Sequence, residues 1–149
     1  MSAGGTVVHD IVPLVVSAAL GTLLGWERQV GRKPAGLRTH TLVCLGSTLF
    51  ILTARHAAAV MGGSSDPTRI IHGIVTGVGF LGAGSILRHE GSVFGLTTAA
   101  SIWMVAAIGS AAGVEAYTLA AAGTALALMV LWGYRRLDRW LAREDDHGA

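Results

Sequence analysis

The spacing of the charged residues constrains this chain most, because a bilayer core excludes charge and a helix needs about 20 apolar residues to cross it. Only 13% of the 149 residues are charged, whereas 52% are hydrophobic. Five uncharged stretches of 16, 16, 18, 24 and 19 residues lie between charges, at 11–26, 39–54, 70–87, 91–114 and 116–134. The pattern predicts an all-α polytopic membrane protein with a bundle of about five transmembrane helices. We expect Arg55 to extend its stem along the second helix so that its guanidinium reaches the headgroups.

The composition excludes several classes of protein. A soluble domain has about 25% charged residues, so a soluble enzyme and a disordered tail are both excluded. Cys44 is the single cysteine, which rules out a disulfide scaffold. The net charge of +2 gives no basic face for nucleic acid. Because residues 1–10 contain no Lys or Arg, we expect the first apolar stretch to be a retained helix rather than a signal peptide.

The basic residues predict the orientation, because short cytoplasmic loops are rich in Lys and Arg. Three segments, the first loop, the third loop and the tail, carry nine of them: Arg28, Arg32, Lys33, Arg38, Arg88, Arg135, Arg136, Arg139 and Arg143. Only Arg55 and Arg69 lie on the other side. We therefore expect the N-terminus outside and the C-terminus in the cytoplasm, with a transmembrane domain over residues 1–137 and a short charged tail over 138–149.

Glycine predicts how the helices pack, since helices in lipid associate through close backbone approach. In the third helix, one face holds Gly73, Gly77 and Gly84, and the other holds Gly79, Gly82 and Ala83. We predict that this helix is the buried centre of the bundle and that Gly77→Leu abolishes stable expression. The segment 77–82 also matches the G-x-G-x-x-G pattern of dinucleotide-binding proteins, but it lies inside an apolar span, so packing is the favoured interpretation.

Two interpretations fit the polar loop over residues 27–40. It is either a positive-inside anchor that contacts anionic lipid, or a docking or anion-binding surface that presents Arg28, Lys33 and Arg38, with Glu27 orienting one of them. In the second loop, Asp66 before Pro67 predicts a helix N-cap, and we assign Asp66 and Arg69 to capping and the outer rim. Gly91 and Gly95 predict a turn in the third loop, and Thr97 or Thr98 a cap for the fourth helix.

Residues for catalysis or metal binding are scarce. No two histidines have the spacing of a metal pair, and four of them lie near span ends, where we expect interfacial or packing roles: His40, His56, His72 and His89. Five acidic residues flank spans, and none lies mid-span, which weakens a transport interpretation: Asp10, Glu27, Asp66, Glu90 and Glu115. We expect no enzyme activity, no cofactor and no metal site.

Three ordered blocks resemble the bacterial MgtC/SapB family over about residues 20 to 130. The first block runs from Gly25-Trp26-Glu27-Arg28-Gln29 through Lys33–His40 to Leu45-Gly46-Ser47. The second comprises Asp66–Ile70 and Gly77–Gly84, and the third is Gly95–Ala100. The order and spacing of the blocks are more specific than any one glycine motif.

This resemblance implies a multi-pass inner-membrane protein linked to growth at low magnesium and, in some pathogens, to survival in macrophages. Family members associated with virulence are thought to restrain the proton-translocating ATP synthase rather than to move Mg²⁺. Two departures limit the transfer. Thr97 replaces the Asn of virulence-associated members, and, with the sequence ending at Ala149, we expect no ACT-like domain of the kind that many members carry.

The sequence thus favours a non-enzymatic regulator that contacts a membrane partner, with the ATP synthase as one candidate. Its expected contact surface is cytoplasmic and comprises Glu27, Arg28, Lys33, Arg38, Arg88 and Thr97. The alternative is a transporter of Mg²⁺ or another cation that acts as an oligomer. We expect the protein to lie in the lipid bilayer, to form a homo-oligomer and to bind no nucleic acid.

Overall fold

The residues that the structure describes fold into five helices and one short β-hairpin. The computed structural model describes residues 3–63, 66–89 and 92–145, and the side chains within these ranges from residue 8 to residue 134. The elements in chain order are α1 (Ala3–Val30), α2 (Leu37–Met61), α3 (Pro67–Gly84), β1 (Leu87–His89), β2 (Ser92–Phe94), α4 (Leu96–Gly113) and α5 (Tyr117–Asp145). The expected all-α bundle of five helices is confirmed. The hairpin was not expected, and the predicted boundary at residue 137 falls inside α5.

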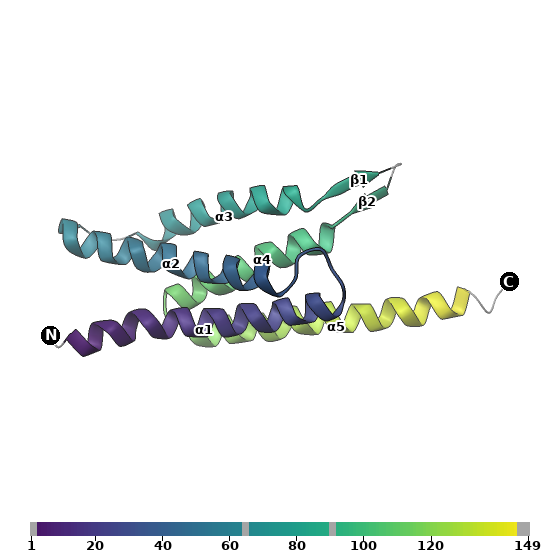
Figure 1. Ribbon diagram of the computed structural model, residues 1–149, viewed down its shortest axis with the longest axis horizontal. Helices are drawn as coiled ribbons and strands as arrows, with labels where there is room; N and C mark the ends of the chain where they lie inside the picture. Colours follow the sequence, from purple (N-terminus) through teal and green to yellow (C-terminus); the bar gives the residue numbers. More distant parts are fainter. Residues whose placement is uncertain (1–2, 64–65, 90–91, 146–149) are drawn as a thin grey trace.

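Successive helices run in opposite directions, so the connections gather at two ends of the bundle (Figure 1). We call these the hairpin end, with residues 31–36 and the strands β1 and β2, and the Glu115 end, with Gly62 and the turn 114–116. The helix α1 begins at the Glu115 end, and α5 ends beyond the hairpin end. The first and third loops therefore share one end, as the charge pattern predicts; the membrane side that each end faces stays a prediction.

Within the described part of the chain, four helices are long and apolar enough to cross a membrane: α1 over Val8–Val30, α2, α4, and α5 over Tyr117–Tyr134. The helix α3 is outside this set, and its first two turns carry Pro67, Arg69 and His72. The five helices are therefore confirmed, whereas the count of five spans is not.

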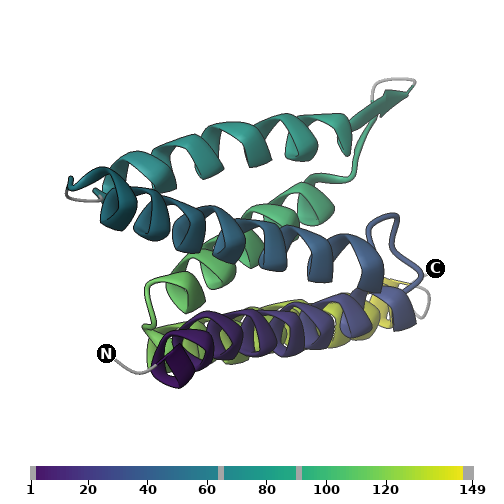
Figure 2. The same cartoon turned by 60° about the vertical axis from the view of Figure 1, so that its left-hand side comes forward.

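The centre of the bundle is α4, and the prediction that the third helix is central is wrong for the single chain. The helix α4 contacts all four other helices, and 61% of its span is buried, against 28% for α1 and α2 and 11% for α5. Figure 2 shows α4 crossing between the pair α1 and α5 and the pair α2 and α3. The reason is that α4 is apolar on all sides, as expected of a fully surrounded helix.

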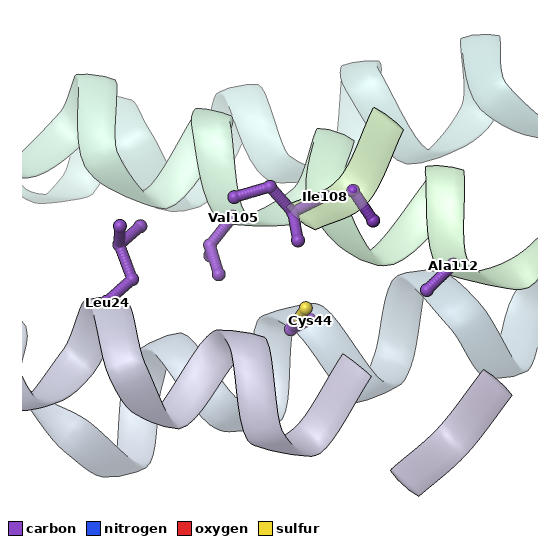
Figure 3. Packing of buried hydrophobic residues seen from close by; sticks show 6 residues of the cluster. Leu24, Cys44, Val105, Ile108 and Ala112 are labelled. Carbon is purple, nitrogen blue, oxygen red and sulfur yellow. The ribbon is translucent and has the colours of Figure 1, made fainter. Parts of the chain in front are cut away.

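One core cluster joins α1, α2, α4 and α5. Leu24, Cys44 and Val105 are fully buried, and Ile108 and Ala112 extend the cluster along α4 (Figure 3). A second cluster attaches α3 to α4 through Ile74, Val78, Ile102 and Ala106. Most of α3 outside this contact is exposed.

The glycines that permit close approach lie in α1 and α4, in two G-x-x-x-G pairs that the prediction missed. A Cβ added at Gly25 would lie 2.7 Å from Leu37 Cα, and one at Gly109 would lie 2.9 Å from the carbonyl carbon of Cys44. Their pair members, Gly21 and Gly113, also contact α2. The α2 backbone therefore lies directly against both helices, as small residues allow in membrane bundles.

The five predicted packing glycines of α3 behave differently. A Cβ at Gly82 would meet Ala99 Cβ at 3.7 Å, which is ordinary contact. For the other four, an added Cβ would meet nothing within 4 Å: Gly73, Gly77, Gly79 and Gly84. Within one chain, a Cβ at position 77 therefore meets no neighbour, and the packing of this single chain gives no support to the predicted loss of expression of Gly77→Leu.

The N-cap predicted for α3 is confirmed, whereas the one predicted for α4 is not. Asp66 accepts a hydrogen bond from Thr68 N at 2.9 Å, and Pro67 occupies the first turn, as the sequence predicts for α3. Arg69 takes no part in that bond. The predicted threonine cap of α4 is wrong, because the cap is Gly95 at φ +87°. A Cβ there would collide with the Ser85 carbonyl, so glycine is required at this position.

Candidate functional site at the hairpin end

The exposed basic residues of the predicted contact surface lie at the hairpin end. Lys33 follows α1, Arg38 lies in the first turn of α2, and Arg88 lies on β1, opposite Val93 in the hairpin register. All three side chains are exposed, as is Thr97 at the start of α4. Two separate connections therefore present positive charge at the same end of the bundle (Figure 1).

Glu27 and Arg28 lie beneath that surface. Their side chains are 11% and 4% exposed, and Arg28 Nη1 lies 3.7 Å from Glu27 Oε2. The prediction that these two residues form one exposed surface with Lys33 and Arg38 is therefore wrong. A buried guanidinium needs compensating charge, since desolvation penalises an isolated ion strongly. The adjacent Glu27 carboxylate supplies negative charge there.

His40 joins α2 to α4 in the same region. Its ring is completely buried, with Nδ1 2.9 Å from Gly36 O and Nε2 3.0 Å from Ser101 Oγ. Because a carbonyl only accepts, Nδ1 carries the proton and Nε2 of the neutral ring accepts from the Ser101 hydroxyl. That hydroxyl also lies 2.8 Å from Thr98 O, so its one proton has two acceptors in reach.

The hydrogen bonds of His40 fix the loop that carries the exposed cations. Gly36 is the last residue before α2, and its carbonyl accepts from both the His40 backbone N–H at 3.2 Å and the His40 ring. The ring thereby ties Gly36 to the central helix. From the sequence, only an interfacial or packing role is expected for His40; its partner Ser101 gives no signal there, because the two residues are 61 positions apart.

A second charged cluster lies at the Glu115 end. Arg55 forms ion pairs with Glu115 and with Asp10, the latter at 3.0 Å, and His56 Nε2 lies 2.9 Å from Asp10 Oδ2. His9 Nδ1 lies 3.5 Å from Glu115 Oε2. Arg55 therefore binds α1 and the α4–α5 turn rather than only extending toward headgroups. Spacing in the sequence gave no signal for this cluster, since Arg55 and Glu115 are 60 positions apart.

Glu115 has the geometry of a residue under constraint. Its φ of +63° is rare for a residue with a side chain. The hydrogen bond from Arg55 holds the pKa of Glu115 below its ordinary value of 4.5, although partial desolvation opposes this. The ionised carboxylate thus supports a strained turn by pairing it with α2.

In the part of the chain that the structure describes, no three His, Cys, Asp or Glu side chains are grouped so that they could hold a metal ion.

The long apolar helices place the chain in the class of membrane proteins. The family model for the MgtC family matches residues 14–140, and the chain belongs to that family. The resemblance of the three sequence blocks is thereby confirmed.

Several curated relatives share about 40% identity with the chain. The Escherichia coli K12 protein named "Putative magnesium transporter YhiD" is 40% identical over 141 residues, which cover 92% of this chain and 66% of that protein. Protein SrpB of Synechococcus elongatus is 39% identical, with 86% and 77% covered. Protein MgtC of Brucella abortus is 40% identical, with 82% and 50% covered. The chain thus spans about half to three quarters of these relatives. No solved structure matches it.

Proposed function

We propose that this protein is a non-enzymatic regulator of the bacterial inner membrane that acts by contact with a membrane protein partner during adaptation to low magnesium or host stress. The observation that carries the proposal is the exposed positive charge on two connections at the hairpin end, from Lys33, Arg38 and Arg88. Membership of the MgtC family and the names of the magnesium-related relatives support the setting.

The surroundings of these cations favour a contact surface over a flexible anchor. Gly36 is tied to α4 through His40 and Ser101, and Gly95 holds the hairpin connection against the Ser85 carbonyl. A surface fixed in this way loses little conformational freedom on binding, which lowers the cost of association. An acidic cytoplasmic face of a membrane complex is the chemistry that complements it. Following the family resemblance, the ATP synthase is the first partner to test.

Charge reversal at Arg38 tests the proposal. Arg38 is exposed, so Arg38→Glu should fold normally and yet fail to restore growth of a deletion strain at low magnesium. Arg38→Lys keeps the charge and should restore growth. Unchanged growth with Arg38→Glu, at equal protein level in the membrane, would contradict the proposed surface.

Cation transport by an oligomer is the second candidate. The name of the YhiD relative suggests it, and ionisable groups within a membrane bundle commonly mark ion pathways. Glu27, Arg28 and His40 are such groups, buried near the hairpin end. Purified protein in liposomes separates the two candidates, because a transporter produces magnesium flux above that of empty vesicles and a contact regulator does not.

A further inference from the structure

An apolar groove of about 770 Å³ runs between α2 and α3. It extends along α2 from Leu42 to Ala57 and along α3 from Arg69 to Leu81. The α2 wall alone covers 15 helical rises, or roughly 22 Å, which is most of the roughly 30 Å thickness of a bilayer core. The groove therefore follows the helices through a large part of the membrane.

Missing side chains create the groove. Gly46 lines it from α2, and Gly73 and Gly77 line it from α3. A Cβ added at any of the three would meet nothing within 4 Å. Phe50, which is 65% exposed, also lines it from α2. The two helices thus stand apart where glycines face the gap, and α3 is held to the bundle by Ile74 and Val78, which also line the groove.

The lining of the groove is uncharged along most of its length and carries a positive charge at one end. The Ser47 hydroxyl donates to Val43 O of its own helix at 2.9 Å, so it needs no partner in the groove. Arg69 is the single charged residue of the lining, and it lies in the first turn of α3. Its exposed side chain makes no hydrogen bond or ion pair with any residue that the structure describes. The nearby Asp66 carboxylate is directed to the backbone N–H of Thr68.

We propose that this groove binds an anionic phospholipid, with one acyl chain between α2 and α3 and the phosphate on Arg69. Apolar lining suits the chain, and an arginine fork suits a phosphate. The groove volume of about 770 Å³ falls within the range of small-molecule sites.

Native mass spectrometry of the full chain in detergent tests this site. Phosphatidylglycerol and phosphatidylcholine with identical acyl chains are added in turn, and the lipid-bound fraction is measured. Wild type should retain the anionic lipid about fivefold more strongly, the factor that corresponds to about 1 kcal/mol for one basic residue. Arg69→Gln should lose this preference. Arg32→Gln, which removes an exposed charge at the hairpin end, should keep it.

Groove-filling variants separate this site from the general lipid shell. Gly77→Leu and Gly46→Leu add a side chain to either wall of the groove, at positions where a Cβ would meet nothing within 4 Å, and both should retain less of either lipid. Gly79→Leu is the matched control, because it adds the same side chain to α3 outside the groove lining. Equal retention by all three folded variants would overturn the proposal. A wild-type dimer that Gly77→Leu dissociates would also overturn it, since a second copy would then fill the groove.

Discussion

The close contact between α4 and α2 at Gly109 gives a prediction whose size follows from the geometry. An alanine at Gly109 would drive its Cβ into the carbonyl oxygen of Cys44 and place it 2.9 Å from the carbonyl carbon of the same residue. Ordinary contact begins near 3.4 Å, and the atoms it meets are backbone, which no rotamer change can move away. The two helices must therefore separate by roughly an ångström at this point.

The substitution Gly109→Ala changes the free energy of unfolding in three ways, two of them destabilising and one stabilising. Overpacking a well-packed core typically costs about 1–3 kcal/mol. The bond from Thr48 Oγ1 to Gly109 O, 2.7 Å long, is weakened as well, and such interhelical bonds contribute about 0.6 kcal/mol in membranes. Replacing glycine by alanine within a helix returns about 0.5–1 kcal/mol. We expect Gly109→Ala to lower the free energy of unfolding by roughly 1–3 kcal/mol.

Thermal unfolding of the purified protein in detergent, followed by fluorescence-detected size exclusion, measures this loss. For a chain of this length, 1 kcal/mol corresponds to a shift of about 2–4 °C, so the midpoint should fall by several degrees. Gly79→Ala is the control, because its Cβ would meet nothing within 4 Å and its midpoint should hold or rise. Equal midpoints for the two variants would refute the assignment of α4 as the tightly packed centre.

Three further predictions follow from single contacts. Ser101→Ala deprives His40 Nε2 of its buried partner and should cost about 1–3 kcal/mol, whereas Ser110→Ala, which loses only a bond within α4, should cost less in the same unfolding assay. The ionised Glu115 carboxylate stabilises the folded state, so its stabilising contribution is fully present above pH 4.5 and is lost as the pH falls through its lowered pKa. In Glu115→Gln, the unfolding midpoint measured against pH should lack this decrease. Asp66→Ala should cost α3 about 1 kcal/mol and speed amide exchange in its first turn.

Much of the fold is predictable because charge and bilayer thickness act locally along the chain. The uncharged gaps predict five helices, and the structure has five at these positions. The Asp66-Pro67 cap and the shared end of the first and third loops are equally local. The identity of the central helix cannot be predicted from local sequence, because the glycine faces of α3 show only that a close neighbour is possible there.

The candidate site was only partly predictable for the same reason. The cations Lys33, Arg38 and Arg88 can be recognised from the sequence, because they lie in polar segments between the uncharged stretches. The burial of Arg28 depends on how α1 and α2 pack, and the partners of His40 and Arg55 lie about 60 positions away in the chain. Pairings of this kind arise from helix order and register, which no single segment of the sequence specifies.

Site-specific photocrosslinking in native membranes tests the central claim, contact with a membrane partner through the hairpin end, most directly. A photoreactive residue at Arg88 probes that end, and one at Met61, which is 83% exposed near the other end, is the control. The account predicts one defined membrane protein crosslinked from position 88, lost with Arg38→Glu and absent from position 61. The same products from both positions, or products unaffected by Arg38→Glu, would contradict it.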